Sequence, residues 1–407
     1  MVPTVKSALI LLAAMLAASN MIDLLADIIA IAVAKVSVVE LGLLNSLSSA
    51  SYLVSMAFSS ALSERGVVRL QVLIAFLAFS ACVGFLALFN STGIYALLVL
   101  CYLVYPLAQA FSRAAILAYV YESLPGSKWA RALITGFIAS SITEALCLLA
   151  FSLLGIKLIL SSGFAAVFLL LLPFSLSLLL VREPVMKIER PLHRIELSID
   201  YLESSISRFL AYVWLSEGSL RADVSKYLRE RYSTLPKSSL LKLAQVGFKL
   251  GSALMLSTLP AVLASKLRLS LDAIMLVYSV SKFLNILTLL QTSHHWAKAV
   301  LPILRPLLWY AIVGVSISNY LALGAILGLI LYIGGSTDVE LFTLYVKSTR
   351  GKGSSLYIVL GEVAFVAGAA MSGYVFSVLG PATAVIAVLL SIPSSISIIS
   401  GKPQKRL

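Results

Sequence analysis

The chain has 407 residues, of which 60% are hydrophobic and only 12% are charged, and its mean hydropathy is +1.00. Soluble domains carry roughly 25% charged residues, so this composition excludes a globular protein that is solvated on all sides. The formal net charge of +13 does not require nucleic acid as a partner, because membrane proteins gather lysine and arginine in their cytoplasmic loops. We therefore expect an integral membrane protein whose first partner is the lipid bilayer.

Apolar runs long enough to cross a bilayer recur along the whole chain. A spanning helix needs about 20 apolar residues, and the first run is too long for the apolar region of a signal peptide. The runs cover residues 7–33, 38–62, 70–90, 93–119, 132–154, 158–181, 239–262, 270–290, 299–317, 319–346, 355–377 and 380–399. The sequence predicts an all-α integral membrane protein of about twelve transmembrane helices, in two six-helix bundles at 1–181 and 238–401.

Basic residues decide which side of the membrane each loop faces. With the N-terminus inside, the short cytoplasmic segments hold twelve basic residues and the opposite side holds four, Lys35, Lys157, Lys266 and Arg268. Both termini, including the tail at 402–407, are therefore expected in the cytoplasm. We expect a monomer in the plasma membrane.

The stretch at 182–237 interrupts the apolar pattern with a helical period. Its apolar stripe consists of Ile195, Ile199, Leu202, Ile206, Phe209 and Val213. Such a stripe is typical of an amphipathic helix. The segment is interpreted as a cytoplasmic linker between the bundles, and docking of a partner is the alternative.

The two halves resemble each other weakly. A shift of 226 residues places Ala118-Tyr119-Val120, before one basic loop, on Leu344-Tyr345-Val346, before another. Two six-span repeats joined by a cytoplasmic loop explain this pattern.

The loop between the second and third predicted spans carries a degenerate signature. Residues 60–69 read Ser-Ala-Leu-Ser-Glu-Arg-Gly-Val-Val-Arg, where the major facilitator superfamily of secondary transporters has G-x-x-x-D-R-x-G-R-[RK]. Glu64, Arg65 and Arg69 match, while Ser60 and Val67 stand where glycine is usual. The chain also has six predicted spans, then a long cytoplasmic loop, then six more spans. With this arrangement and the loop signature, it resembles that family over essentially its whole length.

The resemblance implies a function and several residue roles. It implies a secondary transporter that moves a small solute by alternating access of its two bundles, with no enzymatic activity and no cofactor. It also implies that Glu64 caps a neighbouring helix at its cytoplasmic end. Arg65 would pair with an acid near the end of the fourth span, for which Glu122 is the candidate.

Polar residues inside the first-half spans are candidate sites, because charge at membrane depth is costly and faces protein or water. One face of the first span carries Asn20, Asp23 and Asp27. One face of the fourth span carries Tyr102, Tyr105, Gln109 and Arg113. This second face either lines a wet cavity or packs against its neighbours.

The fifth span places Glu144 about midway across the membrane. It is flanked by Ser140, Ser141 and Thr143. An acid at this depth can bind and release a proton during transport, so Glu144 is the candidate coupling acid and protons are the expected coupling ion. A permanent structural pair with a base such as Arg113 is the alternative.

The second half supplies bases at mid-depth. Lys249 and Lys282 have polar neighbours at helical spacing, which are Gln245, Ser252, Tyr278 and Asn285. The two lysines either bind an anionic group or neutralise the acids of the first half. Asp338 and Glu362 lie nearer the cytoplasmic end and are expected to form gating or structural pairs. Arg305 is expected to extend its charge toward the membrane surface.

Two other classes of function compete with transport. Asp23 and Asp27 could hold a divalent metal in a membrane-embedded enzyme of lipid or phosphoryl chemistry, although the next acid inside the membrane is expected to be Glu144, on another helix. The amphipathic stretch at 182–237 could instead belong to a receptor or an assembly protein. The sequence contains no nucleotide-binding fingerprint, and the spacing of its three cysteines favours neither disulfides nor a metal site. Mixed charge in the spans disfavours a purely apolar cargo.

Overall fold

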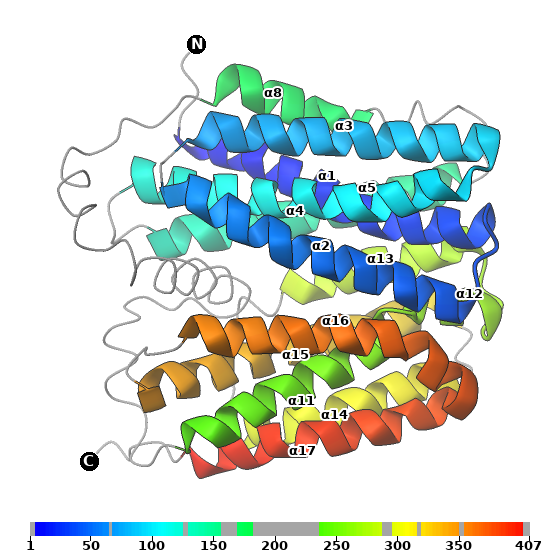
Figure 1. Cartoon of the computed structure of the whole chain (residues 1–407), viewed down its shortest axis with the longest axis vertical. Coiled ribbons are helices and arrows are strands. Elements are labelled where there is room, and N and C mark those ends of the chain that lie inside the picture. The colour runs from blue at the N-terminus through cyan, green and yellow to red at the C-terminus, as the bar shows by residue number, and fades with distance from the viewer. Residues whose placement is uncertain are drawn as a thin grey trace. The chain divides into compact units, whose positions relative to one another are not determined.

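A computed structural model of the chain describes residues 5–64, 67–124, 129–155, 169–181, 236–286, 295–315, 319–349 and 354–401. The regular elements in these ranges are all helices (Figure 1). The tail at 402–407 lies outside them, as does the predicted linker up to residue 235.

The first half contributes α1 (Val5–Ala32), α2 (Val38–Glu64), α3 (Val68–Thr92), α4 (Tyr95–Ser123), α5 (Trp129–Leu154), the 3-10 helix η2 (Leu169–Leu171) and α8 (Leu172–Leu180). The second half contributes α11 (Ser238–Leu256), α12 (Leu259–Ser265), α13 (Leu271–Asn285), α14 (His295–Gly314), α15 (Tyr320–Thr349), α16 (Ser354–Leu379), the 3-10 helix η5 (Gly380–Ala382) and α17 (Thr383–Ser400). These helices follow the twelve predicted runs in order, and the all-helical membrane fold is confirmed.

The chain forms two compact units. Unit 1 comprises residues 1–35 and 47–209, and unit 2 comprises residues 36–46 and 210–407. The first turns of α2 thus cluster with unit 2, where the Ser46 hydroxyl donates to the Val366 carbonyl at 3.0 Å.

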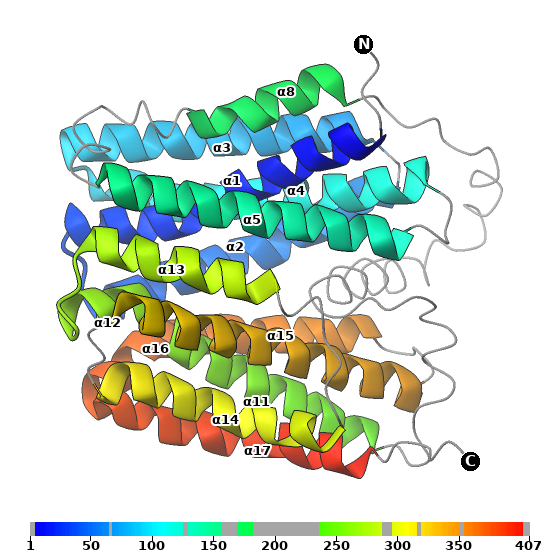
Figure 2. The same cartoon turned by 180° about the vertical axis from the view of Figure 1, so that it is seen from behind.

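Each unit is built around its first span. In unit 1, α1 packs against α4, α5 and α8, and in unit 2, α11 packs against α15, α16 and α17 (Figures 1 and 2). The stretches at Ser7–Ala32 and Ser238–Ser265 are the most buried of the eight described helical stretches that are long and apolar enough to span a bilayer. A helix at the centre of a bundle can carry polar side chains because its neighbours shield them from lipid.

The loop after the first span has the same geometry in both units. Lys35 and Arg268, each three residues past the end of a helix, adopt left-handed φ angles of 52° and 53°. Two residues later, the hydroxyls of Ser37 and Ser270 accept the backbone N–H three positions along, at 3.2 Å in both cases. The two loops therefore match residue for residue, as expected for structural repeats.

The run predicted at 239–262 forms two helices, because the helical hydrogen bonding is interrupted between α11 and α12. Pro260 has no N–H to continue the hydrogen-bond ladder, and its ring disturbs the preceding turn. Side chains take over the exposed carbonyls: Trp309 Nε1 donates to the Met255 oxygen at 2.8 Å, and Asn45 Nδ2 donates to the Ser257 oxygen at 2.7 Å. The break is possible at membrane depth because these donors replace the lost backbone bonds.

The left-handed loop residues give a stability prediction. Lys35→Gly and Arg268→Gly should each stabilise the protein by about 0.5–1 kcal/mol, since glycine adopts positive φ without the Cβ clash. Lys266→Gly is the control, because Lys266 has a φ of −87° and glycine there only adds unfolded-state freedom. Thermal unfolding in detergent should show raised midpoints for the first two variants and a lowered midpoint for the control. Equal shifts in all three would contradict the strain argument.

Candidate functional site

In unit 1, the buried carboxylate of Asp27 and the half-buried carboxylate of Asp23 on α1 face two tyrosines on α4. Tyr102 donates its hydroxyl to Asp27 Oδ1 at 2.6 Å, and Tyr105 donates to Asp23 Oδ1 at 2.5 Å. The two tyrosine rings lie edge to face, with centroids 5.8 Å apart. The spacings along α1 and α4 predicted both faces, and the structure brings them together.

A third helix joins this cluster through Ser48 on α2. Its hydroxyl lies 2.5 Å from the Tyr105 hydroxyl. Because a hydroxyl has one proton and that of Tyr105 goes to Asp23, Ser48 is the donor in this pair. The result is a chain of hydrogen bonds from Ser48 through Tyr105 to Asp23, which connects α2, α4 and α1.

The remaining candidates of the first half lie around this cluster. Asn20 on α1 and Gln109 on α4 are half-buried. Arg113, on the same face of α4, donates from Nη1 to the Tyr52 hydroxyl on α2 at 3.0 Å. Glu144 on α5 is only 5% exposed, as expected for an acid held inside the bundle.

In unit 2, one face of α11 carries a polar stripe of Gln245, Lys249 and Ser252, at helical positions i, i+4 and i+7. Gln245 contacts α16, Lys249 contacts α15 and α16, and Ser252 contacts α14. Gln245 Oε1 accepts the Tyr357 hydroxyl of α16 at 3.1 Å. This stripe makes α11 the connection between the polar side chains of α14, α15 and α16.

Lys249 is bound by two acids of its own unit. Its Nζ lies 3.3 Å from Asp338 Oδ2 on α15 and 3.4 Å from Glu362 Oε1 on α16, and the three side chains are 12%, 16% and 18% exposed. The sequence had suggested a partner in the first half or an anionic ligand for this lysine. It could not show that α15 and α16 present acids at the same depth.

Arg305 does not extend to the membrane surface, and that prediction is wrong. Its side chain is 4% exposed and lies inside unit 2. Its Nη1 donates to Ser252, its Nε donates to the Ile330 carbonyl at 3.2 Å, and its guanidinium carbon is 5.1 Å from the centre of the Phe248 ring. Hydrogen bonds and a cation–π contact stabilise the charge internally, so Arg305 joins the polar stripe as a member that sequence reasoning missed.

A glycine makes room for this arginine. A Cβ on Gly334 of α15 would lie 2.9 Å from Arg305 Nη2 and 3.0 Å from Cζ. An alanine at this position would have to displace the guanidinium from its present place. The signal available in the sequence was a small residue one turn before Asp338, which by itself indicates only close helix packing.

The other predicted site residues are spread over the fold. Lys282 is half-buried in the last turn of α13, the helix that packs against α15. Arg69 Nε donates at 3.0 Å to the Val181 carbonyl, directly after α8. The predicted contact between Arg65 and Glu122, and the side chains of Glu64 and Asn285, lie outside the described part of the structure.

The Arg305 environment gives a second prediction. Gly334→Ala should destabilise the protein by about 1–3 kcal/mol, because the added methyl forces the guanidinium away from its partners. Gly84→Ala is the matched control, since a Cβ there meets no atom within 4 Å and alanine favours a helix by about 0.5–1 kcal/mol. Thermal unfolding should show opposite shifts, and a Gly334→Ala variant as stable as the Gly84→Ala variant would contradict this packing.

Comparison with known proteins supports the fold. No protein-family model and no curated protein matches the chain. Among solved structures, nucleoside transporter NupG matches with a TM-score of 0.64 and 12% identity, covering 98% of both chains. A point mutant of the same transporter matches with a TM-score of 0.65 and 14% identity, over 97% of this chain and 99% of that chain.

A third solved structure is similar over almost its full length. The human organic anion transporter MFSD10 matches with a TM-score of 0.58 and 13% identity, covering 97% of this chain and 98% of that chain. Identities this low compare folds only. The chain shares its fold with these transporter structures, which confirms the fold that the resemblance in the sequence implied.

Proposed function

We propose that this protein is a secondary transporter that moves a small polar solute by alternating access of its two six-helix units. One observation carries the proposal: the first span of each repeat unit is buried and holds a polar stripe, in a fold shared with transporters. The stripe of α1 presents carboxylates to tyrosine hydroxyls, and that of α11 presents an ammonium to carboxylates. Such groups are costly in a membrane and mark solute and ion pathways.

The chemistry of the stripes favours a polar organic solute over a purely apolar one. The side chains offer hydroxyl, amide, carboxylate and ammonium groups, which serve as donors and as acceptors. The solved structures of similar fold are named as a nucleoside transporter and an organic anion transporter, so nucleosides and organic anions are the first compounds to screen.

The function is tested by flux into liposomes. Purified protein should show ligand-dependent thermal shifts, and reconstituted protein should accumulate the stabilising solute with saturable kinetics. Absence of flux for every solute that stabilises the protein would favour the receptor or enzyme alternatives.

Proton coupling through Glu144 is the finer part of the proposal. Glu144→Gln preserves size and hydrogen bonding but removes the change of charge, so accumulation driven by a pH gradient should fall by roughly tenfold or more. Solute exchange across the membrane without a gradient should persist. Flux assays with and without a pH gradient measure both properties.

A structural role for Glu144 predicts a different result. If the variant accumulates solute with unchanged pH dependence, Glu144 does not couple transport to protons, and a permanent pair with a base such as Arg113 is the better explanation. Thr143→Val, at the neighbouring residue whose hydroxyl donates to the Ala139 carbonyl at 2.8 Å, is the control for a general disturbance of α5.

We also propose that the termini and residues 182–237 are cytoplasmic and that the protein resides in the plasma membrane as a monomer. The excess of basic residues in the short segments on that side supports this orientation. A cysteine introduced at Ser204 should react with a membrane-impermeant maleimide only after cells are permeabilised. Labelling in intact cells would show that this segment lies outside the cell, which contradicts the proposed orientation.

The loop residues Glu64, Arg65, Arg69 and Glu122, together with Asp338 and Glu362, are proposed to act in gating or structural support. The Arg69 contact with the carbonyl after α8 supports a structural contribution at that end of unit 1.

A further inference from the structure

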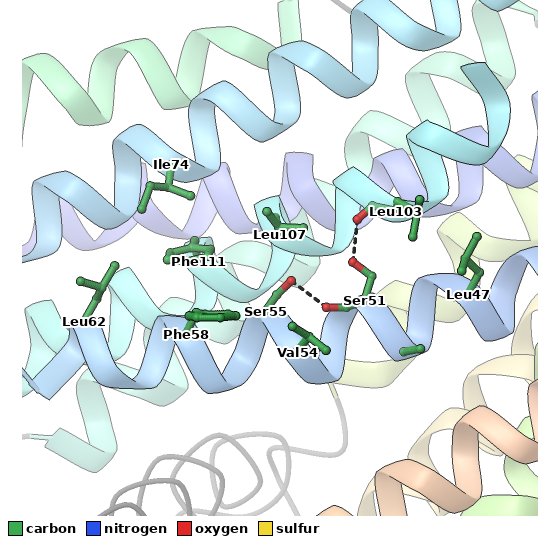
Figure 3. A pocket seen from close by; sticks show the side chains of 11 residues that line it. Leu47, Ser51, Val54, Ser55, Phe58, Leu62, Ile74, Leu103, Leu107 and Phe111 are labelled. Atoms are coloured by element: carbon green, nitrogen blue, oxygen red, sulfur yellow. Dashed lines mark hydrogen bonds between the residues drawn. The ribbon is translucent and has the colours of Figure 1, made fainter. Parts of the chain in front are cut away.

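A long apolar groove runs along α2 within unit 1. It has a volume of about 710 Å³. Figure 3 shows its three sides: Val54 and Phe58 of α2, Ile74 of α3, and Leu107 of α4. Its size falls in the range of pockets that hold organic ligands, roughly 300–1,000 Å³.

The two serines of the groove offer no free hydroxyl proton to a ligand. Ser51 Oγ donates to the Leu103 carbonyl at 2.6 Å, and Ser55 Oγ donates to the Ser51 carbonyl at 2.7 Å (Figure 3). Both hydroxyl protons are therefore used within the protein. The remaining lining residues are Leu, Val, Phe, Ile and Ala, so the groove fits a ligand that is apolar along its length.

Hydrogen bonds attach α2 to α4 beside the groove. Ser48 and Tyr52 contact Tyr105 and Arg113 of α4 through hydrogen bonds. Beside α2, helices α3 and α4 pack closely against each other along their lengths. The groove lies between α2 and this pair of helices and is lined by residues of all three.

The walls of the groove continue into the surface that faces lipid. Val54 and Phe58 are 56% and 66% exposed, and Leu77, one turn beyond Ile74 on α3, is 56% exposed. Large apolar side chains on the outside of a spanning helix contact the hydrocarbon of the bilayer. An acyl chain can therefore enter the groove from the bilayer without crossing a polar barrier.

The length of the groove also matches an acyl chain. Its lining runs from Leu47 to Leu62 on α2, which is about 22 Å of helix at 1.5 Å per residue. One leaflet contributes about half of the 30 Å hydrocarbon core. The groove can therefore hold one chain over the full depth of a leaflet.

We propose that this groove is a binding site for one acyl chain of a bilayer phospholipid, which completes the packing of α2 against α3 and α4. The lipid is then a structural component of unit 1 and remains bound when bulk lipid is removed. This inference goes beyond transport and does not depend on the identity of the solute.

The proposal is tested by replacing a small lining residue of the groove with a large one. Ala50 lines it, and Ala50→Phe places a ring where the acyl chain would lie. Ala57→Phe is the matched control, with the same substitution on the same helix at an exposed position that does not line the groove. Each full-length protein is purified in detergent, and its bound phospholipid is counted by native mass spectrometry.

The wild type and Ala57→Phe should retain phospholipid that Ala50→Phe loses. Adding palmitoyl-oleoyl phosphatidylcholine to delipidated protein should raise the thermal midpoint of the first two proteins and leave that of Ala50→Phe unchanged. If Ala50→Phe does not fold, Ala50→Leu and Ser55→Leu provide the same comparison with smaller side chains.

Three results would overturn the proposal. Equal phospholipid in Ala50→Phe and the wild type would place the retained lipid elsewhere. A dimer that dissociates in Ala50→Phe would make a second copy of the chain the occupant. A raised KM for the transported solute in Ala50→Phe, with unchanged bound lipid, would assign the groove to the solute. Because lipid is counted without a flux assay, failure of this proposal is distinct from failure of the transport proposal.

Discussion

Polar groups inside a bilayer must find their partners within the protein, because lipid provides none. This constraint explains why each unit is organised around its first span. The polar side chains of α1 and α11 are tolerated because α4, α5 and α8 surround the first helix, and α15, α16 and α17 surround the second. Hydroxyls satisfy the carboxylates of α1, and carboxylates satisfy the ammonium of α11.

The two units share a backbone plan but differ in chemistry. Their first loops match down to the left-handed residue and the capping serine, and equivalent helices pack around each first span. The side chains at the centre are not repeated, since unit 1 combines acids with tyrosines and unit 2 combines two bases with two acids.

Helix α2 is divided between the two units. Its first turns cluster with unit 2 and the rest of the helix clusters with unit 1, where Ser48 and Tyr52 form hydrogen bonds with α4 and an apolar groove lies between α2, α3 and α4. An acyl chain in the groove would add apolar contacts to α2, so the lipid content of a preparation is expected to influence its stability.

The sequence by itself determined the class of protein, the number and order of the spans, and the helical faces that carry polar residues. Length and hydropathy are sufficient for the spans because the bilayer has a fixed thickness. Helical periodicity is sufficient for a face such as Asp23 and Asp27, because residues three and four apart lie on the same side. The resemblance to the transporter family rested on the same arrangement of spans.

Only the tertiary structure decided which faces meet. The pairing of Lys249 with Asp338 and Glu362 joins α11 to two helices that come much later in the chain, and no periodicity within one helix specifies such a contact. Arg305 was misjudged because its burial depends on Gly334, Ser252 and Phe248, which come from two other helices. The break before α12 and the groove beside α2 depend in the same way on packing between helices, which a single sequence does not encode in any local pattern.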